Sequence, residues 1–193
     1  MTDAQLKGRR PIFWISVGAG LVALILLAVA LADGFGRDPR EPENIANQGA
    51  KIDMTRVLPL LDGTGDVAFS ELEGKIIVIN FWASYCIPCR AEHEVLTTAS
   101  EQYRDQNVQF LGIVFHDDPD AARDFLDTLG WGDGYLYAED PGARATVDFG
   151  VWGVPETYFV DATGTIVDKH YGAITRDDLI PVLESILAGD SAG

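Results

Sequence analysis

The sequence predicts an α/β fold in which helices flank a mixed central sheet, with one transmembrane helix at the N-terminus. Two observations carry this prediction: after Lys75, apolar β-branched runs alternate with helical stretches, and a strand–turn–strand pair precedes the last helix. This order is typical of a sheet with helices on both faces. A third observation, a single long uncharged apolar segment, predicts the membrane helix. At 193 residues, the length suits one domain with attachments.

The apolar segment covers residues 11–32, which contain no charged side chain. About 20 apolar residues are needed to cross a membrane. Basic residues precede the segment and Asp33 follows it, so the positive-inside rule places residues 1–10 in the cytoplasm as a short tail. We therefore predict a transmembrane signal anchor at 11–32 that exports the rest of the chain.

A cleaved signal peptide is the alternative, because Ala30-Leu31-Ala32 resembles a small-residue cleavage site. The apolar core is longer than the roughly 7–15 residues usual for such peptides, and Trp14 stands near its start like an interfacial anchor. These features favour the uncleaved anchor. Both interpretations export the domain.

Charge is divided unevenly along the chain. The net charge is −16, with +2 in residues 1–32 and −18 in the remainder. A chain this acidic lacks the basic face that nucleic-acid binding requires. Residues 33–51 are rich in Gly, Pro and Asn and predict a flexible linker, so the folded domain is expected over 52–190.

The first elements of the domain follow in order. A short apolar stretch over 57–61 ends at an Asp-Gly turn signal, and a helical turn is expected at 70–74. The unbroken apolar run over 76–82 suits a central strand covered on both faces. A helix is expected from about Cys86 to about Gln106, followed by a second buried strand over 108–115.

The second half continues the alternation. Residues 119–129 predict a helix with proline in its first turn, followed by a short strand at 135–137 and a short helix at 141–148. Strands at 157–160 and 165–168, joined by a turn, predict a hairpin. An amphipathic helix over 175–188 ends the domain.

Cys86 and Cys89 are the two cysteines of the chain, in a Cys-x-x-Cys motif. They are too few for a disulfide scaffold or a four-cysteine zinc site, and the three histidines show no ligand spacing, so we predict no metal and no cofactor. Cys86 follows a buried strand at the expected start of a helix, where backbone N–H groups and the helix dipole favour a thiolate. Cys89 lies one turn further and is expected to be more buried, placed to attack a mixed disulfide. The motif therefore predicts thiol–disulfide exchange at an exposed Cys86.

Two other interpretations of the cysteine pair are weak. An inert structural disulfide at this spacing would close a very small loop and restrain the unfolded chain little. Covalent haem attachment needs histidine directly after the second cysteine, and Arg90 stands there. Further along, Pro155 precedes a predicted strand, a position that suits either a cis bond or an ordinary loop proline.

Two segments carry a resemblance to a known family. Residues 81–93 (FWASYCIPCRAEH) resemble the active-site segment of membrane-anchored, TlpA-like thioredoxin-like reductases. Residues 150–158 (GVWGVPETY) resemble the GVxGxPET segment of the thiol:disulfide interchange proteins of cytochrome c maturation, the CcmG/DsbE type. The resemblance covers about residues 55–188 and the anchor. Tyr85 departs from the tryptophan usual before the first cysteine, which puts details of partner docking in doubt.

The resemblance implies a thioredoxin-like fold with a nucleophilic Cys86, a resolving Cys89 that forms the redox disulfide with it, and a cis-Pro155. It also implies acidic residues near the dithiol, which match Glu92 and Glu156. A carboxylate near a buried thiol can accept its proton and raises its pKa by like-charge repulsion, which favours a reducing protein. Solvent exposure of Glu92 on its helix is the alternative.

The sequence also leads to predictions for the exposure or role of three further residues. We expect His93 to be exposed, and Trp131 and Trp152 to serve packing or partner contacts rather than catalysis.

The function that the resemblance implies is disulfide reduction in cytochrome c maturation. The protein would sit in the inner (cytoplasmic) membrane as a single-pass protein with its redox domain facing the periplasm. Its partners would be apocytochrome c or a maturation protein, together with a membrane thiol donor that re-reduces it. The alternatives are a general extracytoplasmic reductase or oxidase and a non-covalent apocytochrome-binding module.

Overall fold

A computed structural model describes Gly20 and residues 49–189. The predicted tail, the predicted anchor apart from Gly20, and most of the predicted linker therefore lie outside the described residues. Within the described part of the chain, no helix combines the length and the apolar character needed to cross a membrane.

The described elements form an alternating α/β chain. The strands are β1 (Val57–Pro59), β2 (Asp66–Ala68), β3 (Ile76–Trp82), β4 (Val108–Val114), β5 (Tyr135–Ala138), β6 (Glu156–Val160) and β7 (Ile166–Tyr171). The α-helices are α2 (Ile87–Tyr103), α3 (Pro119–Leu129), α4 (Arg144–Phe149) and α5 (Arg176–Leu187), and the short 3-10 helices are η2 (Phe69–Leu72) and η3 (Arg104–Gln106).

The central sheet is mixed, as predicted. Its strand order is β5-β4-β3-β6-β7, with β3, β4 and β5 parallel and β6 antiparallel to both β3 and β7. All residues of β3 are buried because the strand lies at the centre of the sheet with both faces covered. That position explains the unbroken apolar run that marked this strand in the sequence.

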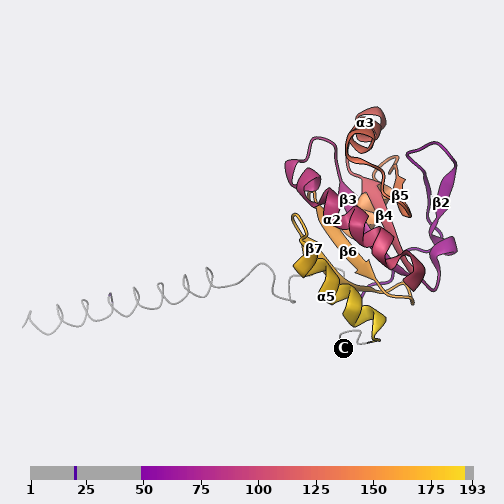
Figure 1. Cartoon of the computed structure of the whole chain (residues 1–193), viewed down its shortest axis with the longest axis vertical. Helices are drawn as coiled ribbons and strands as arrows, with labels where there is room; N and C mark the ends of the chain where they lie inside the picture. Colours follow the sequence, from indigo (N-terminus) through magenta and orange to yellow (C-terminus); the bar gives the residue numbers. More distant parts are fainter. Residues whose placement is uncertain (1–19, 21–48, 190–193) are drawn as a thin grey trace, which may run out of the picture. The chain divides into compact units, whose positions relative to one another are not determined.

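Helices cover both faces of the sheet. On one face α2, α3 and α5 bury Leu96, Phe125 and Leu183 in one cluster with Val78 of β3, and Figure 1 shows α2 and α5 lying in front of the sheet. On the other face α4 and the β1–β2 hairpin pack against Ile79 in a second cluster. Because side chains alternate along β3, the same strand contributes to both clusters.

Several predicted boundaries shift by a few residues, and two larger departures lie in the first part of the domain. The sequence did not indicate β2, which pairs antiparallel with β1 and has only three residues, too few to show a period. The predicted linker runs to Lys51, yet Gly49 N donates to Ile166 O at 2.8 Å and Lys51 forms a bridge with Thr165. Backbone pairing therefore includes residues that composition assigned to the linker.

Candidate active site

Cys86 and Cys89 lie at the carboxyl end of β3 and form a disulfide with an S–S distance of 1.99 Å. Cys86 is the N-cap of α2, and its Sγ accepts a hydrogen bond from Cys89 N at 3.1 Å. Pro88 occupies the first turn, where a missing N–H removes no helix bond. An N–H group and the positive end of the helix dipole are thus directed at the Cys86 sulfur, which stabilises a thiolate there.

The two cysteines differ less in exposure than predicted. Cys86 is 7% exposed and Cys89 is 3% exposed, so Cys89 is the more buried one, but the expectation of an exposed Cys86 is wrong for the disulfide form. The reason is packing, because both cysteines join a core cluster with Trp82. The exposed surface around them comes from their neighbours Tyr85 and Ile87.

The loop that carries Cys86 is held by the segment after β4. Ser84 N donates to Asp117 Oδ2 at 2.5 Å, and Tyr85 Oη donates to Phe115 O at 3.5 Å. Both acceptors lie between β4 and α3, so this segment sets the conformation of the residues just before the first cysteine.

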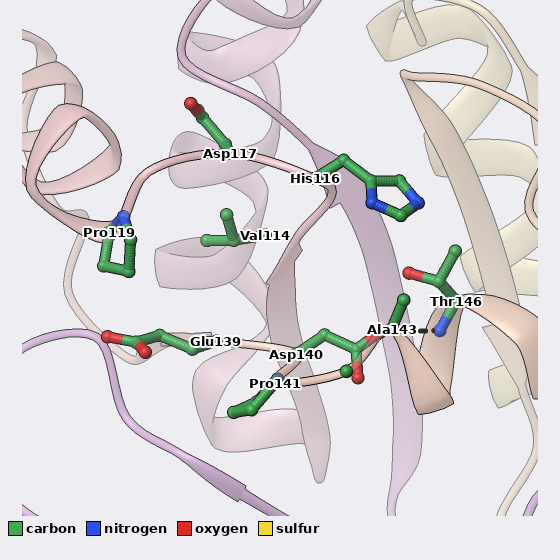
Figure 2. A pocket seen from close by; sticks show the side chains of 10 residues that line it. Val114, His116, Asp117, Pro119, Glu139, Asp140, Pro141, Ala143 and Thr146 are labelled. Carbon is green, nitrogen blue, oxygen red and sulfur yellow. Dashed lines mark hydrogen bonds between the residues drawn. The ribbon is translucent and has the colours of Figure 1, made fainter.

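The same segment borders a hollow of about 330 Å³. Figure 2 shows His116 and Asp117 on one side of it, and Glu139 and Asp140 on the other. Asp140 has a structural role, because its carboxylate accepts a hydrogen bond from Thr146 N at 2.8 Å at the start of α4. The hollow therefore adjoins the active-site loop through Asp117.

Glu92 lies one turn after Cys89 on α2 and is only 2% exposed. Its Oε1 accepts from Asn80 Nδ2 and its Oε2 accepts from Ile174 N, both at 2.8 Å. Burial raises the pKa of Glu92 to about 7, although the two hydrogen bonds oppose that shift. The alternative of a solvated Glu92 is wrong. Near neutral pH this carboxyl can both take up and release a proton.

Glu156 lies on the opposite face of the sheet from the cysteines. It pairs with Phe81 across β3 and β6, and Phe81 belongs to the cluster that α4 covers. Trp82, the next residue along β3, packs with Cys86 and Cys89 instead. The two carboxyl groups expected beside the dithiol are thus separated by the sheet, because successive side chains of a strand point to opposite faces.

The Glu156 carboxylate is also paired with a cation. Its Oε2 lies 2.9 Å from Lys169 Nζ, and both side chains are almost completely buried. Its Oε1 accepts from Trp152 N at 3.1 Å. Because Lys169 balances its charge, like-charge repulsion of a thiolate by Glu156 is weaker than the sequence suggested.

Pro155 follows a cis peptide bond after Val154. The β3–β6 register brings Pro155 next to the end of β3, where the active-site loop leaves the sheet. Its carbonyl oxygen accepts from Gly172 N at 2.9 Å. The segment before β6 therefore lies at the same end of the sheet as the cysteines.

The expectation that His93 is exposed is wrong, because His93 is 8% exposed and its Nε2 donates to Gly130 O at 2.7 Å. Burial lowers its pKa. Trp131 Nε1 donates to Asp127 Oδ1, whereas Trp152 is 91% exposed.

Sequence reasoning missed Asn80 and Lys169. Each is a polar residue within or beside an apolar strand, and that is the signal by which they could have been found. Among residues 49–189, no group of three or more His, Cys, Asp or Glu side chains is placed to hold a metal ion.

Comparisons with known proteins agree with this geometry. The Redoxin family pattern matches residues 48–187. The chain is 39% identical to the thiol:disulfide interchange protein HelX of Rhodobacter capsulatus over 88% of this chain and 94% of that protein. It is 33% identical to the thiol:disulfide interchange protein DsbE of Pseudomonas fluorescens, over 90% of this chain and 96% of that protein. The exposed lipoprotein thioredoxin Etrx1 of Streptococcus pneumoniae is similar in fold, with a TM-score of 0.60, 24% identity, and coverage of 67% of this chain and 98% of that one.

Proposed function

The chain belongs to the Redoxin family, and on that premise we propose that it is a membrane-tethered disulfide reductase of cytochrome c maturation. It has a thioredoxin-like fold and is a thiol:disulfide oxidoreductase, as its similarity to thiol:disulfide interchange proteins over most of its length shows. The proposal adds the direction of the reaction, the substrate and the tether.

The observation that carries the proposal is the redox pair at the start of α2, with Cys86 at the N-cap and Cys89 bonded to it. In the reduced protein, the Cys86 thiolate attacks one sulfur of a substrate disulfide. A mixed disulfide forms, and the other substrate sulfur leaves as a thiolate that takes a proton from water. The Cys89 thiolate then attacks Cys86 Sγ, and the second substrate sulfur leaves as a thiolate that also takes a proton from water. Two electrons pass to the substrate, and the Cys86–Cys89 disulfide remains.

Glu92 is the group that we assign to proton transfer at Cys89. It lies one helical turn away on α2, on the same face of the sheet, and its pKa of about 7 suits a proton acceptor at neutral pH. Because Glu92 is buried and bonded to both Asn80 and Ile174 N, it keeps one orientation. A carboxyl group there stabilises the thiol form of Cys89 relative to the thiolate, which favours a reducing protein.

The substrate that we propose is the disulfide of a haem-binding CxxCH motif in apocytochrome c, or a disulfide in a maturation partner. The resemblance of residues 150–158 to the GVxGxPET segment supports this choice. Pro155 lies beside the end of β3, where backbone groups can meet an extended peptide. A membrane thiol donor must re-reduce the Cys86–Cys89 disulfide, because the oxidising periplasm has no pool of thiols to do so.

The test is a trapping experiment with a peptide that contains an oxidised CxxCH motif. We expect Cys89→Ala to accumulate a mixed disulfide through Cys86, since the resolving thiol is absent. Cys86→Ala should form none and should lose all reduction of the peptide. The measurement is intact mass after alkylation, and a peptide with one cysteine replaced by serine is the control.

Three outcomes would overturn the proposal. A Cys86→Ala protein that still supports cytochrome maturation would indicate a non-covalent binding module. A redox equilibrium with glutathione that leaves the dithiol strongly oxidising would indicate an oxidase. Equal trapping of unrelated disulfide peptides would indicate a general extracytoplasmic reductase.

A further inference from the structure

Lys169 of β7 is a buried cation outside the Cys86–Cys89 pair. Its side chain is 1% exposed, and its Nζ lies 2.9 Å from Glu156 Oε2. The ammonium also lies over the rings of Tyr158 and Tyr171, at 4.6 and 4.3 Å from their centroids. Burial of an ammonium is favourable only beside an anion and aromatic faces of this kind, and Lys169 and Glu156 form such a buried ion pair.

Glu156 connects the Lys169 ammonium to the segment that precedes Pro155 in the chain. While Oε2 faces Lys169, Oε1 accepts the backbone N–H of Trp152 at 3.1 Å. The Tyr158 hydroxyl lies 3.0 Å from Oε2 and 2.8 Å from Phe149 O at the end of α4. One carboxylate thus ties β7, β6 and the chain after α4 together.

The segment 151–155 depends on such backbone bonds. The Trp152 side chain is 91% exposed, so packing of the ring does little to hold it. The hydrogen bond from Trp152 N to an ionised carboxylate is of the stronger, charge-assisted kind. The segment also adjoins the end of β3, from which the loop to Cys86 departs.

We propose that Lys169 is a positioning residue that, through Glu156, holds segment 151–155 in place to dock the extended peptide around a substrate disulfide. The docking rests on the proposed function, whereas the positioning does not. Without the ammonium, the Glu156 carboxylate loses the ion pair that fixes its orientation, and its hydrogen bond with Trp152 N weakens. The cysteines lie on the other face of the sheet, so their chemistry is expected to continue.

The first test is hydrogen exchange of the Trp152 amide, followed by NMR. Lys169→Met removes the charge with a side chain of similar length, and Lys169→Arg keeps it. We expect exchange about tenfold faster in Lys169→Met and recovery toward the original rate in Lys169→Arg. The amides of α2 serve as the internal control and should not change. Unchanged Trp152 exchange in a folded Lys169→Met protein would overturn the proposal.

A second variant keeps the test decisive if Lys169→Met fails to fold. The pair Lys169→Met with Glu156→Gln leaves no buried charge unpaired and keeps an oxygen for Trp152 N to bond. Because that oxygen is neutral, we expect Trp152 exchange a few times faster than in the original protein. Exchange at the original rate would show that the ion pair does not hold the segment.

The second test separates docking from chemistry. For the oxidised CxxCH peptide, we expect Lys169→Met to raise KM about tenfold while kcat stays within about twofold, with KM restored in Lys169→Arg. A lower kcat at unchanged KM would overturn the docking role. Should the original protein fail to reduce the peptide, the proposed function fails, and Trp152 exchange still decides whether Lys169 positions the segment.

Discussion

At the scale of single residues, Glu92 is an acid whose pKa is raised inside the fold from its ordinary 4.5 to about 7. Between these values the unfolded chain has lost the proton that the folded chain still holds. The stability that protonated Glu92 contributes is therefore complete below about pH 4.5 and is lost as the pH rises through 7. Over this pH interval, the shifted pKa changes the free energy of unfolding by about 3 kcal/mol.

We predict that Glu92→Gln removes this loss of folding stability at higher pH. Urea unfolding of the oxidised protein between pH 5 and pH 8 should show a fall in the free energy of unfolding, and the fall should be smaller by about 2–3 kcal/mol in the variant. Glutamine keeps an oxygen for Ile174 N, and the Asn80 amide can turn to accept from it. An identical pH dependence in both proteins would contradict the assignment of a raised pKa to Glu92.

Single residues also show what the sequence could not tell about the site. The order in which Cys86 and Cys89 are buried follows from their places on a helix, but their actual exposure depends on how Trp82 and the rest of the cluster pack around them. The same is true of His93, which is covered by the chain around Gly130. Burial by a distant segment leaves no mark on the local sequence.

At the scale of elements, β4 depends on a glycine at its centre. Gly112 pairs with Asn80 of β3 and with Tyr137 of β5. A Cβ at this position would lie 2.7 Å from Tyr137 Cδ1 and 2.9 Å from Trp82 Nε1. Trp82 is the last residue of β3 before the loop to Cys86, so any displacement there reaches the active-site loop.

We predict that Gly112→Ala destabilises the protein by about 1–3 kcal/mol, as overpacking of a core does. The measurement is urea unfolding, with the near-ultraviolet circular dichroism of tryptophan as a probe of Trp82. The matched control is Gly153→Ala, because a Cβ at Gly153 meets nothing within 4 Å. Its cost should stay within about 0.5 kcal/mol. Equal effects of the two substitutions would show that Gly112 is not tightly packed.

Elements were the level at which the sequence was most informative. The predicted strand over 76–82 and the predicted helix over 119–129 have the boundaries that the structure gives them. A continuous apolar run marks the first, and Pro119 in the first turn marks the second. The structure adds Asp118 as its N-cap, whose carboxylate accepts from Asp120 N. Such local signals act within a few residues, and for that reason they can be read without the fold.

At the scale of the whole molecule, the tether remains a prediction from residues 1–32. We predict that the full chain stays in the membrane fraction after alkaline carbonate extraction, with residues 1–32 still present by mass spectrometry. The reason is the length of the uncharged segment, which is sufficient to span the apolar core of a bilayer. A soluble product that begins after Ala32 would identify a cleaved signal peptide instead.

The sequence by itself determined the order of the elements from Lys75 onward, the helix start at the redox pair and the family, because each depends on residues that are neighbours along the chain. Only the tertiary structure decided which side of the sheet each acid faces, placing Glu92 with the cysteines and Glu156 with Lys169. Alternation along a strand tells which residues share a face but not which helix will cover it. The partners of a buried charge come from distant segments, and therefore only the folded chain reveals them.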